Sequence, residues 1–237
     1  MDIPYLTTDQ MREVDRAMIE DFGIELMQMM ENAGRNLAHL ARMRFLSDDP
    51  CERPVVVLAG TGGNGGGGLV AARRLHNWGA SVHVITSGGD VAFKGVPAHQ
   101  LAILRRMGVS VTQADAVEAL PTADVILDAV IGYSLRGAPR DMAAKLIRLA
   151  NAHGAPILSL DVPSGVDTTT GTAYDPHIRA MATLTLALPK KGLRTPESER
   201  AVGELYLADI SVPPAVYENM GLTVGPIFAA QEIIRLP

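Results

Sequence analysis

The chain has 237 residues, of which 47% are hydrophobic and 20% are charged, and its formal net charge is -5 at pH 7. This length predicts one domain, since single hydrophobic cores stop growing at about 250 to 300 residues. The longest apolar runs fall well short of the ~18 residues that a bilayer-spanning helix needs, so no membrane helix is expected. The acidic balance disfavours nucleic-acid binding, which depends on Lys and Arg neutralising phosphates. A small-molecule ligand is therefore expected.

The N-terminus and the cysteine content favour a cytoplasmic location. The first residues read "MDIPYLTTDQMREVDRAM". They lack the basic region followed by an apolar stretch that is typical of a leader peptide. Cys51 is the only cysteine, so the chain can form neither an internal disulfide nor a cysteine-based metal cluster.

The first 46 residues are predicted to form a helical arm. Thr7 and Gln10 match a capping box at the start of one helix, and Gly23 lies where that helix would end. A second helix is expected in "ELMQMMENAGRNLAHLARMRFL", with one apolar face. This face consists of Met27, Met30, Ala33, Leu37, Leu40 and Ala41. It suits packing in the core or, if exposed, a homodimer.

From Pro54 onward, short apolar runs alternate with amphipathic segments. Strands are predicted at 54–59, 81–86, 109–112, 124–130 and 156–162, and helices at 67–78, 95–107 and 139–153. This alternation is typical of a parallel sheet covered by helices on both faces. "ATLTLALP" and "GELYLADI" follow with little room for a full helix between them, so one or both are expected as antiparallel additions at the sheet edge. The predicted organisation is a single domain over 1–237, with the arm at 1–46, the core at 54–212 and a tail at 213–237.

Polar residues follow three of the predicted strands, and ligands of open α/β sheets bind beyond the carboxyl ends of strands. The first strand leads into "GTGGNGGGG" with Asn64, the fourth ends at Asp128, and the fifth ends at Asp161 in "SLDVPSGVDTTTG" with Ser164 in the turn. These loops are therefore expected to meet at one edge of the sheet.

The glycine run is open to more than one interpretation. Gly60, Gly62 and Gly65 match G-x-G-x-x-G, but the acidic residue expected at the end of the second strand of a dinucleotide fold is missing. A Walker A loop is excluded because no Lys-Ser or Lys-Thr follows the glycines. The run is better interpreted as backbone N–H groups at a helix N-terminus that suit an anionic or polar ligand. A flexible turn without a ligand is the alternative.

The two aspartates and a nearby lysine are also open to alternatives. Asp128 and Asp161 each end an apolar strand, where a carboxylate can bind a cation, have a raised pKa suited to proton transfer, or accept bonds from loop amides. Ser164 and Gly165 allow oxygen atoms to converge on a hard cation. Lys190 could meet a phosphate or lie at a solvated strand end.

The motifs in this order resemble the NAD(P)H-hydrate epimerase family, the YjeF N-terminal domain group that includes apolipoprotein A-I-binding protein. The resemblance covers nearly the whole chain. It is carried by "LMQMMENAGRNLA", "GTGGNGGGGLVAARRLHNWG", "ILDAVIGYSLRGAPR", "LSLDVPSGVDTTTG", "LALPKKG" and "GELYLADISVPPAVYENMGL".

This resemblance implies a Rossmann-like, mostly parallel sheet, a homodimer and the interconversion of the R and S hydrates of NADH or NADPH, which a separate dehydratase then repairs. It implies a potassium ion held by Asn64, Asp128 and Ser164, and Asp161 as the catalytic acid/base. The implied substrate contacts are Gly63, Asn64, Gly65, Gly66, Gly67, Gly132, Tyr133, Ser134, Leu135, Arg136, Gly137, Ala138, Asp161 and Lys190.

The opening loop departs from the family pattern. The family usually reads G-N-N-G-G-D-G, whereas this chain reads "GGNGGGG", with Gly63 in place of the first asparagine and Gly67 in place of the aspartate. The missing carboxylate motivates an alternative function, a non-catalytic or differently specific nucleotide-binding module on the same fold. A hydride-transferring dehydrogenase is the least favoured function, because the acid after the second strand is absent.

Overall fold

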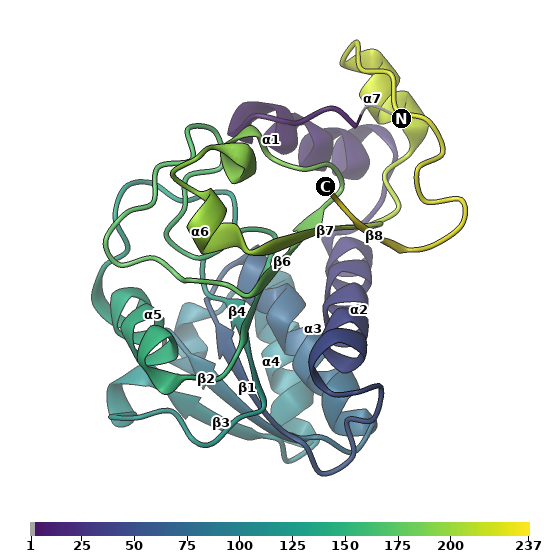
Figure 1. Ribbon diagram of the computed structural model, residues 1–237. Helices are drawn as coiled ribbons and strands as arrows, with labels where there is room; N and C mark the ends of the chain where they lie inside the picture. Colours follow the sequence, from purple (N-terminus) through teal and green to yellow (C-terminus); the bar gives the residue numbers. More distant parts are fainter. Residues whose placement is uncertain (1–2) are drawn as a thin grey trace.

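The computed structural model describes residues 3–237 and contains one sheet of eight strands (Figure 1). Met1 and Asp2, with which the predicted domain begins, lie outside the described residues. The sheet order is β3-β2-β1-β4-β5-β6-β7-β8. The strands are β1 (Pro54–Ala59), β2 (Ser81–Thr86), β3 (Ser110–Gln113), β4 (Val125–Ala129), β5 (Ile157–Leu160), β6 (Ala182–Leu186), β7 (Glu204–Ala208) and β8 (Ile233–Arg235).

Seven α-helices in residues 3–237 lie around this sheet. They are α1 (Thr8–Arg16), α2 (Leu26–Phe45), α3 (Gly63–Asn77), α4 (Gly95–Arg106), α5 (Asp141–His153), α6 (Glu199–Val202) and α7 (Pro214–Asn219). The short turns are a π-helical segment η1 (Ala17–Asp21) and the 3-10 segments η2 (Asp90–Ala92), η3 (Ala114–Ala116) and η4 (Lys191–Arg194).

The sheet is parallel from β3 through β7, and only β8 runs antiparallel. The mostly parallel α/β fold and its five predicted strands are confirmed, but the expectation of an antiparallel β6 or β7 is wrong. Residues 187–203 between them contain η4 and α6, which is enough chain to return to the same end of the sheet. The antiparallel addition is β8, which pairs with β7.

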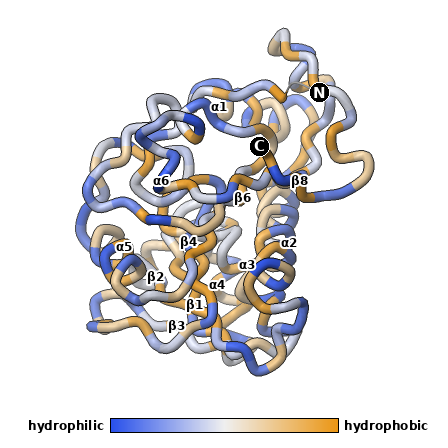
Figure 2. Tube along the Cα trace, viewed as in Figure 1, coloured by the Kyte–Doolittle hydropathy of each residue, from blue (hydrophilic) through white to orange (hydrophobic). Residues whose placement is uncertain are grey.

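Alternate residues of the central strands face two different helical layers. Val55 and Val57 of β1 pack in the core cluster that contains residues of α2, α3 and α4. Val56 and Leu58 pack with Ile147 and its neighbours in α5 on the other face. Figure 2 shows β1 and β4 in hydrophobic colours between these layers. Burial on both faces explains why these strands read as continuous apolar runs.

The N-terminal helices α1 and α2 pack against the rest of the same chain. The capping box of Thr7 and Gln10 is confirmed at the start of α1. On α2, the apolar face packs mainly against α3, with Met30 and Leu37 buried and Met27 half-buried. The idea that this Met-rich face stays free for a homodimer is wrong, because most of it is already covered inside the chain.

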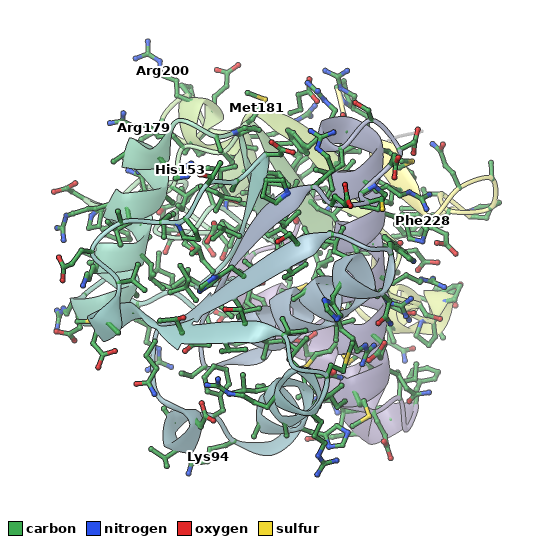
Figure 3. All side chains as sticks on the ribbon, turned by 90° about the horizontal axis from the view of Figure 1, so that it is seen from below. Lys94, His153, Arg179, Met181, Arg200 and Phe228 are labelled. Atoms are coloured by element: carbon green, nitrogen blue, oxygen red, sulfur yellow. The ribbon has the colours of Figure 1, made fainter. Side chains whose placement is uncertain are left out.

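Charged side chains lie on the outer surface. Lys94, Arg179 and Arg200 are exposed, and Figure 3 shows their side chains pointing away from the sheet. Among residues 3–237, no helix is both long and apolar enough to cross a membrane.

Candidate functional site

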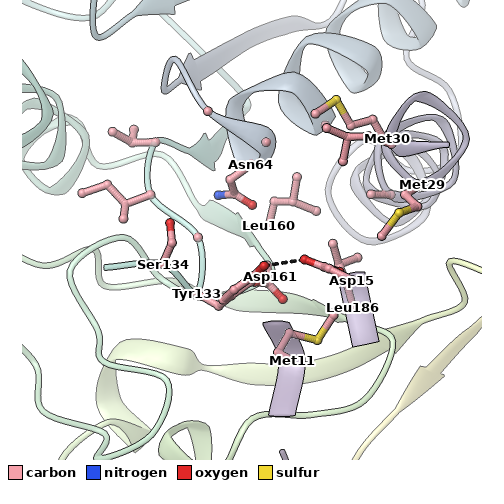
Figure 4. Close-up of a pocket in the computed structure, with 18 of the residues that line it drawn as sticks. Met11, Asp15, Met29, Met30, Asn64, Tyr133, Ser134, Leu160, Asp161 and Leu186 are labelled. Atoms are coloured by element: carbon pink, nitrogen blue, oxygen red, sulfur yellow. Dashed lines mark hydrogen bonds between the residues drawn. The ribbon is translucent and has the colours of Figure 1, made fainter. Parts of the chain in front are cut away.

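The loops after β1, β4 and β5 meet at one cavity of about 490 Å³ (Figure 4). This volume is within the range of small-ligand sites. The cavity is lined by Met11, Asp15, Leu26, Met29, Met30, Ala33, Thr61, Gly62, Gly63, Asn64, Gly67, Ser87, Val130, Ile131, Gly132, Tyr133, Ser134, Ala143, Leu160, Asp161, Leu186 and Ile210. The expectation that the three loops converge is therefore confirmed.

The glycine run lies at the start of α3 rather than in a loop before it. The helix begins at Gly63, with Gly62 as its cap, so the predicted start at residue 67 is wrong. Glycine is a poor helix former, but a Cβ at Gly65 would lie 1.8 Å from the Gly60 carbonyl oxygen, and one at Gly68 would lie 2.5 Å from Ala129 Cβ. These glycines are needed because the helix lies directly against its neighbours.

Gly63 and Gly67, the two departures from the family pattern, both line the cavity. A Cβ at Gly63 would meet only Met30 Cε, at 3.8 Å. A Cβ at Gly67 would lie 2.8 Å from Leu160 Cδ2, which is the end of a flexible side chain. Gly63 thus leaves room for a side chain, whereas a side chain at Gly67 would fit only if the end of Leu160 shifted.

Asn64 lies in the first turn of α3 with its amide free of hydrogen bonds to the described residues. Its Nδ2 atom is buried and has no partner. The amide packs on the β4–α5 loop, because a Cβ at Gly132 would lie 3.3 Å from Asn64 Oδ1. A buried amide without a partner costs free energy. The Nδ2 atom of Asn64 is therefore available to donate a hydrogen bond to a bound ligand.

Asp128, at the end of β4, is fully buried and surrounded by neutral donors. Its Oδ1 accepts bonds from Ser164 Oγ at 2.6 Å and Val130 N at 3.3 Å. Its Oδ2 accepts bonds from Ser159 Oγ at 2.8 Å and Ser164 N at 2.9 Å. Burial raises the pKa of this carboxyl although the bonds from Ser164 and Ser159 oppose the shift. No cationic side chain pairs with it among residues 3–237.

Asp161, directly after β5, has a cationic partner instead. Lys190 Nζ donates to Asp161 Oδ1, and it also donates to Leu186 O at 2.9 Å and Thr185 Oγ1 at 3.2 Å. The Asp161 backbone has φ +67, a left-handed conformation that Asp and Asn tolerate better than most residues. Lys190 is fully buried, so the expectation of a solvated strand end is wrong, and it does not line the cavity itself.

The site also includes a residue from α1 that the sequence analysis missed. Tyr133 Oη donates a hydrogen bond to Asp15 Oδ2, and Figure 4 shows this contact at the cavity wall. Burial is the main cause of the raised pKa of Asp15. Met11 and Met18 are buried on the same face of the N-terminal helix, four residues before and three after Asp15. A carboxylate on an otherwise apolar helix face was the feature of the sequence that could have indicated a role for Asp15.

The predicted substrate residues divide into two groups. Those that line the cavity are Gly63, Asn64, Gly67, Gly132, Tyr133, Ser134 and Asp161. Those that do not are Gly65, Gly66, Leu135, Arg136, Gly137, Ala138 and Lys190. Asp128 and Ser164 are buried behind the cavity wall.

The predicted metal ligands are linked by direct contacts. Asn64 packs on Gly132, Ile131 N donates to Ser164 Oγ at 2.8 Å, and Ser164 bonds Asp128. Amide, hydroxyl and carboxylate oxygens are the ligands of hard cations. Asp128 has no cationic side chain beside it among residues 3–237 and so fits a cation of low charge, whereas the unpartnered Asn64 atom is the amide nitrogen, a donor that suits an acceptor on a ligand, so that only the amide oxygen of Asn64 could bind a cation. Residues 3–237 contain no cluster of three or more His, Cys, Asp or Glu that could hold a metal.

Comparison with known proteins places the chain in a family. The family model described as YjeF-related protein N-terminus matches residues 26–192. A protein of Dehalogenimonas lykanthroporepellens named NAD(P)H-hydrate epimerase is 47% identical over 98% of this chain and 92% of its own length. A Salinibacter ruber protein named bifunctional NAD(P)H-hydrate repair enzyme Nnr is 34% identical over 91% of this chain, which spans only 42% of that relative.

A solved structure supports the same fold. The crystal structure of the yeast protein ynu0 matches 99% of this chain and 100% of its own with a TM-score of 0.80, at 24% sequence identity. Since the family model covers more than half of the chain and the Dehalogenimonas relative is similar along almost all of it, the chain belongs to the YjeF N-terminal family.

Proposed function

We propose that the chain is an epimerase that interconverts the R and S forms of hydrated NADH or NADPH. The single observation that carries the proposal is the cavity at the strand ends, where Asp161 meets the start of α3. The relatives named NAD(P)H-hydrate epimerase support this substrate class.

The reaction requires a bond to oxygen to break and form again. Hydration of a dihydronicotinamide ring leaves a hydroxyl on the carbon bonded to the ring nitrogen. Loss of this hydroxyl as water is assisted by the nitrogen lone pair, and water then returns to the opposite face. An acid must therefore protonate the leaving oxygen, and a base must accept a proton from the returning water.

Asp161 is the group that we place at this reacting carbon. It borders the cavity, and the buried ion pair with Lys190 holds its carboxylate in one position. The backbone N–H groups at the start of α3 suit the pyrophosphate of the substrate, because a helix N-terminus favours anions. Asn64, Asp128 and Ser164 would hold a potassium ion, which when bound would add positive charge beside the substrate phosphates.

The test is to follow R to S interconversion by purified protein in potassium buffer. A known epimerase serves as the positive control, and protein-free buffer gives the spontaneous rate. We expect interconversion far above the spontaneous rate. An inert chain beside an active control would contradict the proposal.

Gly67 favours a second candidate function, a nucleotide-binding module that has lost or changed its activity. Its missing side chain leaves the cavity without one carboxylate, and only the flexible end of Leu160 stands in the way of a replacement. Under this alternative, Gly67→Asp raises a low epimerase rate. If wild type is already as fast as the control and Gly67→Asp slows it, the alternative is contradicted.

The remaining partners follow from the same proposal. We expect a separate dehydratase to consume one epimer, since the Salinibacter ruber relative is named a bifunctional repair enzyme and is much longer than this chain. A homodimer and a cytoplasmic location stay predictions. Light scattering at micromolar concentration checks the homodimer, and Ile19, Phe22 and Leu26, exposed apolar residues around η1, are where we expect its contact.

A further inference from the structure

Tyr133 is a polar residue of the cavity that the proposed function does not yet use. It lies in the β4–α5 loop and lines the cavity together with Asp161. Its ring packs against the apolar cluster that includes Met11 and Leu188. The Tyr133 hydroxyl is therefore a polar group at an apolar part of the site, where a few polar groups determine how a ligand is held.

The Tyr133 hydroxyl and the Asp161 carboxylate lie near one another at one wall of the cavity. Figure 4 shows both side chains there, with Asp15 joined to Tyr133 by the dashed line. Burial is the main cause of the raised pKa of Tyr133, and the charges of Asp15 and Asp161 add to it. The effect of Asp161 agrees with this placement, because the interaction between charges weakens with distance. The phenol stays neutral near pH 7, so it is suited to binding a ligand rather than to accepting a proton.

Asp15 orients the hydroxyl of Tyr133. A phenol has one proton to donate, and its oxygen can also accept. Tyr133 Oη donates to Asp15 Oδ2, so its oxygen is left as an acceptor for a donor in the cavity. Asp161 is not this donor when ionised, because a carboxylate only accepts hydrogen bonds. The partner that suits the Tyr133 oxygen is therefore an O–H or N–H group of a bound ligand.

Further contacts hold Asp15 and Tyr133 in this arrangement. Thr8 Oγ1, at the start of α1, bonds Thr168 Oγ1 at 2.6 Å. Thr168 Oγ1 in turn donates to the Tyr133 carbonyl at 3.3 Å. The helix that carries Asp15 and the loop that carries Tyr133 are thus joined at two points, and the direction of the Tyr133 hydroxyl is set before a ligand binds.

We propose that the Tyr133 oxygen, held by Asp15, binds the ring hydroxyl of the hydrated substrate and so distinguishes it from intact NADH or NADPH. The inference deepens the proposed epimerase function and rests on it, because Asp161 is placed there at the carbon that bears this hydroxyl. The ring hydroxyl donates a hydrogen bond to Tyr133, and its oxygen lone pairs remain free to receive a proton from Asp161. Intact NADH has no hydroxyl and leaves the Tyr133 oxygen without a donor. Asp15 is a positioning residue, since it acts through Tyr133.

The test compares two ligands that differ only in this hydroxyl. One is hydrated NADH as the equilibrium mixture of its epimers, and the other is the tetrahydronicotinamide analogue of NADH, which has the same ring without the hydroxyl. Isothermal titration calorimetry measures both dissociation constants, and their ratio gives the preference for the hydroxyl. Wild type should prefer the hydrate. Tyr133→Phe should lower this preference by about 2- to 12-fold, the contribution of one hydrogen bond between neutral groups, and should leave the affinity for the analogue unchanged.

Asp15 is tested in the same assay by combining variants. Asp15→Leu removes the acceptor, so that the Tyr133 oxygen is no longer held, and should lower the preference about as much as Tyr133→Phe does. Adding Asp15→Leu to Tyr133→Phe should lower it no further, because two residues that act as one unit are not additive. Asp15→Asn keeps an acceptor oxygen and should retain part of the preference. Thermal melts check that each variant is folded.

Two matched variants control this experiment. Tyr206→Phe also removes a hydroxyl that donates to a carboxylate, Glu204 Oε2 at 2.8 Å, but Tyr206 does not line the cavity. Asp9→Asn removes an exposed carboxylate from the same helix as Asp15. Both variants should leave the preference for the hydroxyl unchanged.

The possible failures are distinguishable. An unchanged preference in Tyr133→Phe, or an equal loss of affinity for both ligands, overturns the inference. A further loss when Asp15→Leu is added to Tyr133→Phe overturns the positioning role of Asp15. A wild type that interconverts R and S but binds both ligands equally overturns the inference and leaves the proposed function intact. A wild type that neither binds nor interconverts the hydrate contradicts the proposed function and the inference together.

Discussion

The site contains two buried aspartates at neighbouring strand ends that differ in how their charge is balanced. Within residues 3–237, Asp128 has four hydrogen-bond donors and no cationic side chain, whereas Asp161 has the buried ammonium of Lys190. Asp128 lies behind the cavity wall, and Asp161 faces the cavity.

This difference assigns two tasks, cation binding and catalysis, to different aspartates, whereas the sequence pattern alone does not distinguish them. A buried charge without a partner is costly, so the region of Asn64, Asp128 and Ser164 gains most from a bound cation. A carboxylate that already has its counter-charge inside the protein can face a substrate without one. The cation and the reaction are therefore expected to use different aspartates.

The largest expected effect is on catalysis at Asp161. Asp161→Asn should lower the epimerase rate by about 10²- to 10⁴-fold because the acid/base group is lost. The variant should also lose stability, because the buried Lys190 ammonium loses its counter-charge, although Asn tolerates the positive φ and its amide oxygen can still accept from Lys190; the rates are therefore compared at a temperature at which the melts show the variant and its control folded. Asp48→Asn is the matched control, because Asp48 also has a positive φ but is exposed away from the cavity. Steady-state rates and thermal melts of both variants decide; a near-normal rate for Asp161→Asn removes it from the mechanism.

The next effect is on stability, through Lys190. Lys190→Met leaves Asp161 buried without its partner, and breaking a buried ion pair in this way costs about 3–5 kcal/mol. The double variant Asp161→Asn/Lys190→Met removes both charges and should recover much of this loss. Urea unfolding of the three variants measures the coupling. If Lys190→Met and the double variant are equally unstable, Lys190 does not balance the charge of Asp161.

On the other side of the comparison, Ser159→Ala tests how Asp128 is held. It removes a buried bond to a charged acceptor and should cost about 1.5–3 kcal/mol at neutral pH. Because the pKa of Asp128 is raised, its stabilising contribution is complete below the pKa of the unfolded state and is lost as pH rises through the raised value. Ser159→Ala raises this pKa further, so its cost should be smaller near pH ~4 than at neutral pH. An equal cost at both pH values would contradict the assignment.

The sequence predicts the sheet better than the site. Residues 54–59 coincide with β1, whose burial on both faces gives a continuous apolar run, and residues 81–86 coincide with β2, in which Val82, Val84 and Ile85 are buried. The start of α3 was placed too late because glycine propensity opposes a helix there, and only the close approach of Gly60 and Ala129 explains it. The role of Lys190 as partner of Asp161 depends on residues 29 positions apart that no local pattern connects.

The smallest expected effect is that of potassium on stability, and it tests the comparison most directly. A cation that binds only the folded chain at about ten times its dissociation constant adds about 1.4 kcal/mol, which for a chain of this size raises the melting temperature by about 3–6 °C. Potassium chloride should therefore raise it above the value in choline chloride at equal ionic strength. Asn64→Ala should abolish the difference, since it removes the amide oxygen that is expected to bind the cation, while Asp9→Asn should keep it. If Asn64→Ala retains the full potassium effect, the cation binds elsewhere, and the unpaired charge of Asp128 is balanced by its four hydrogen bonds alone.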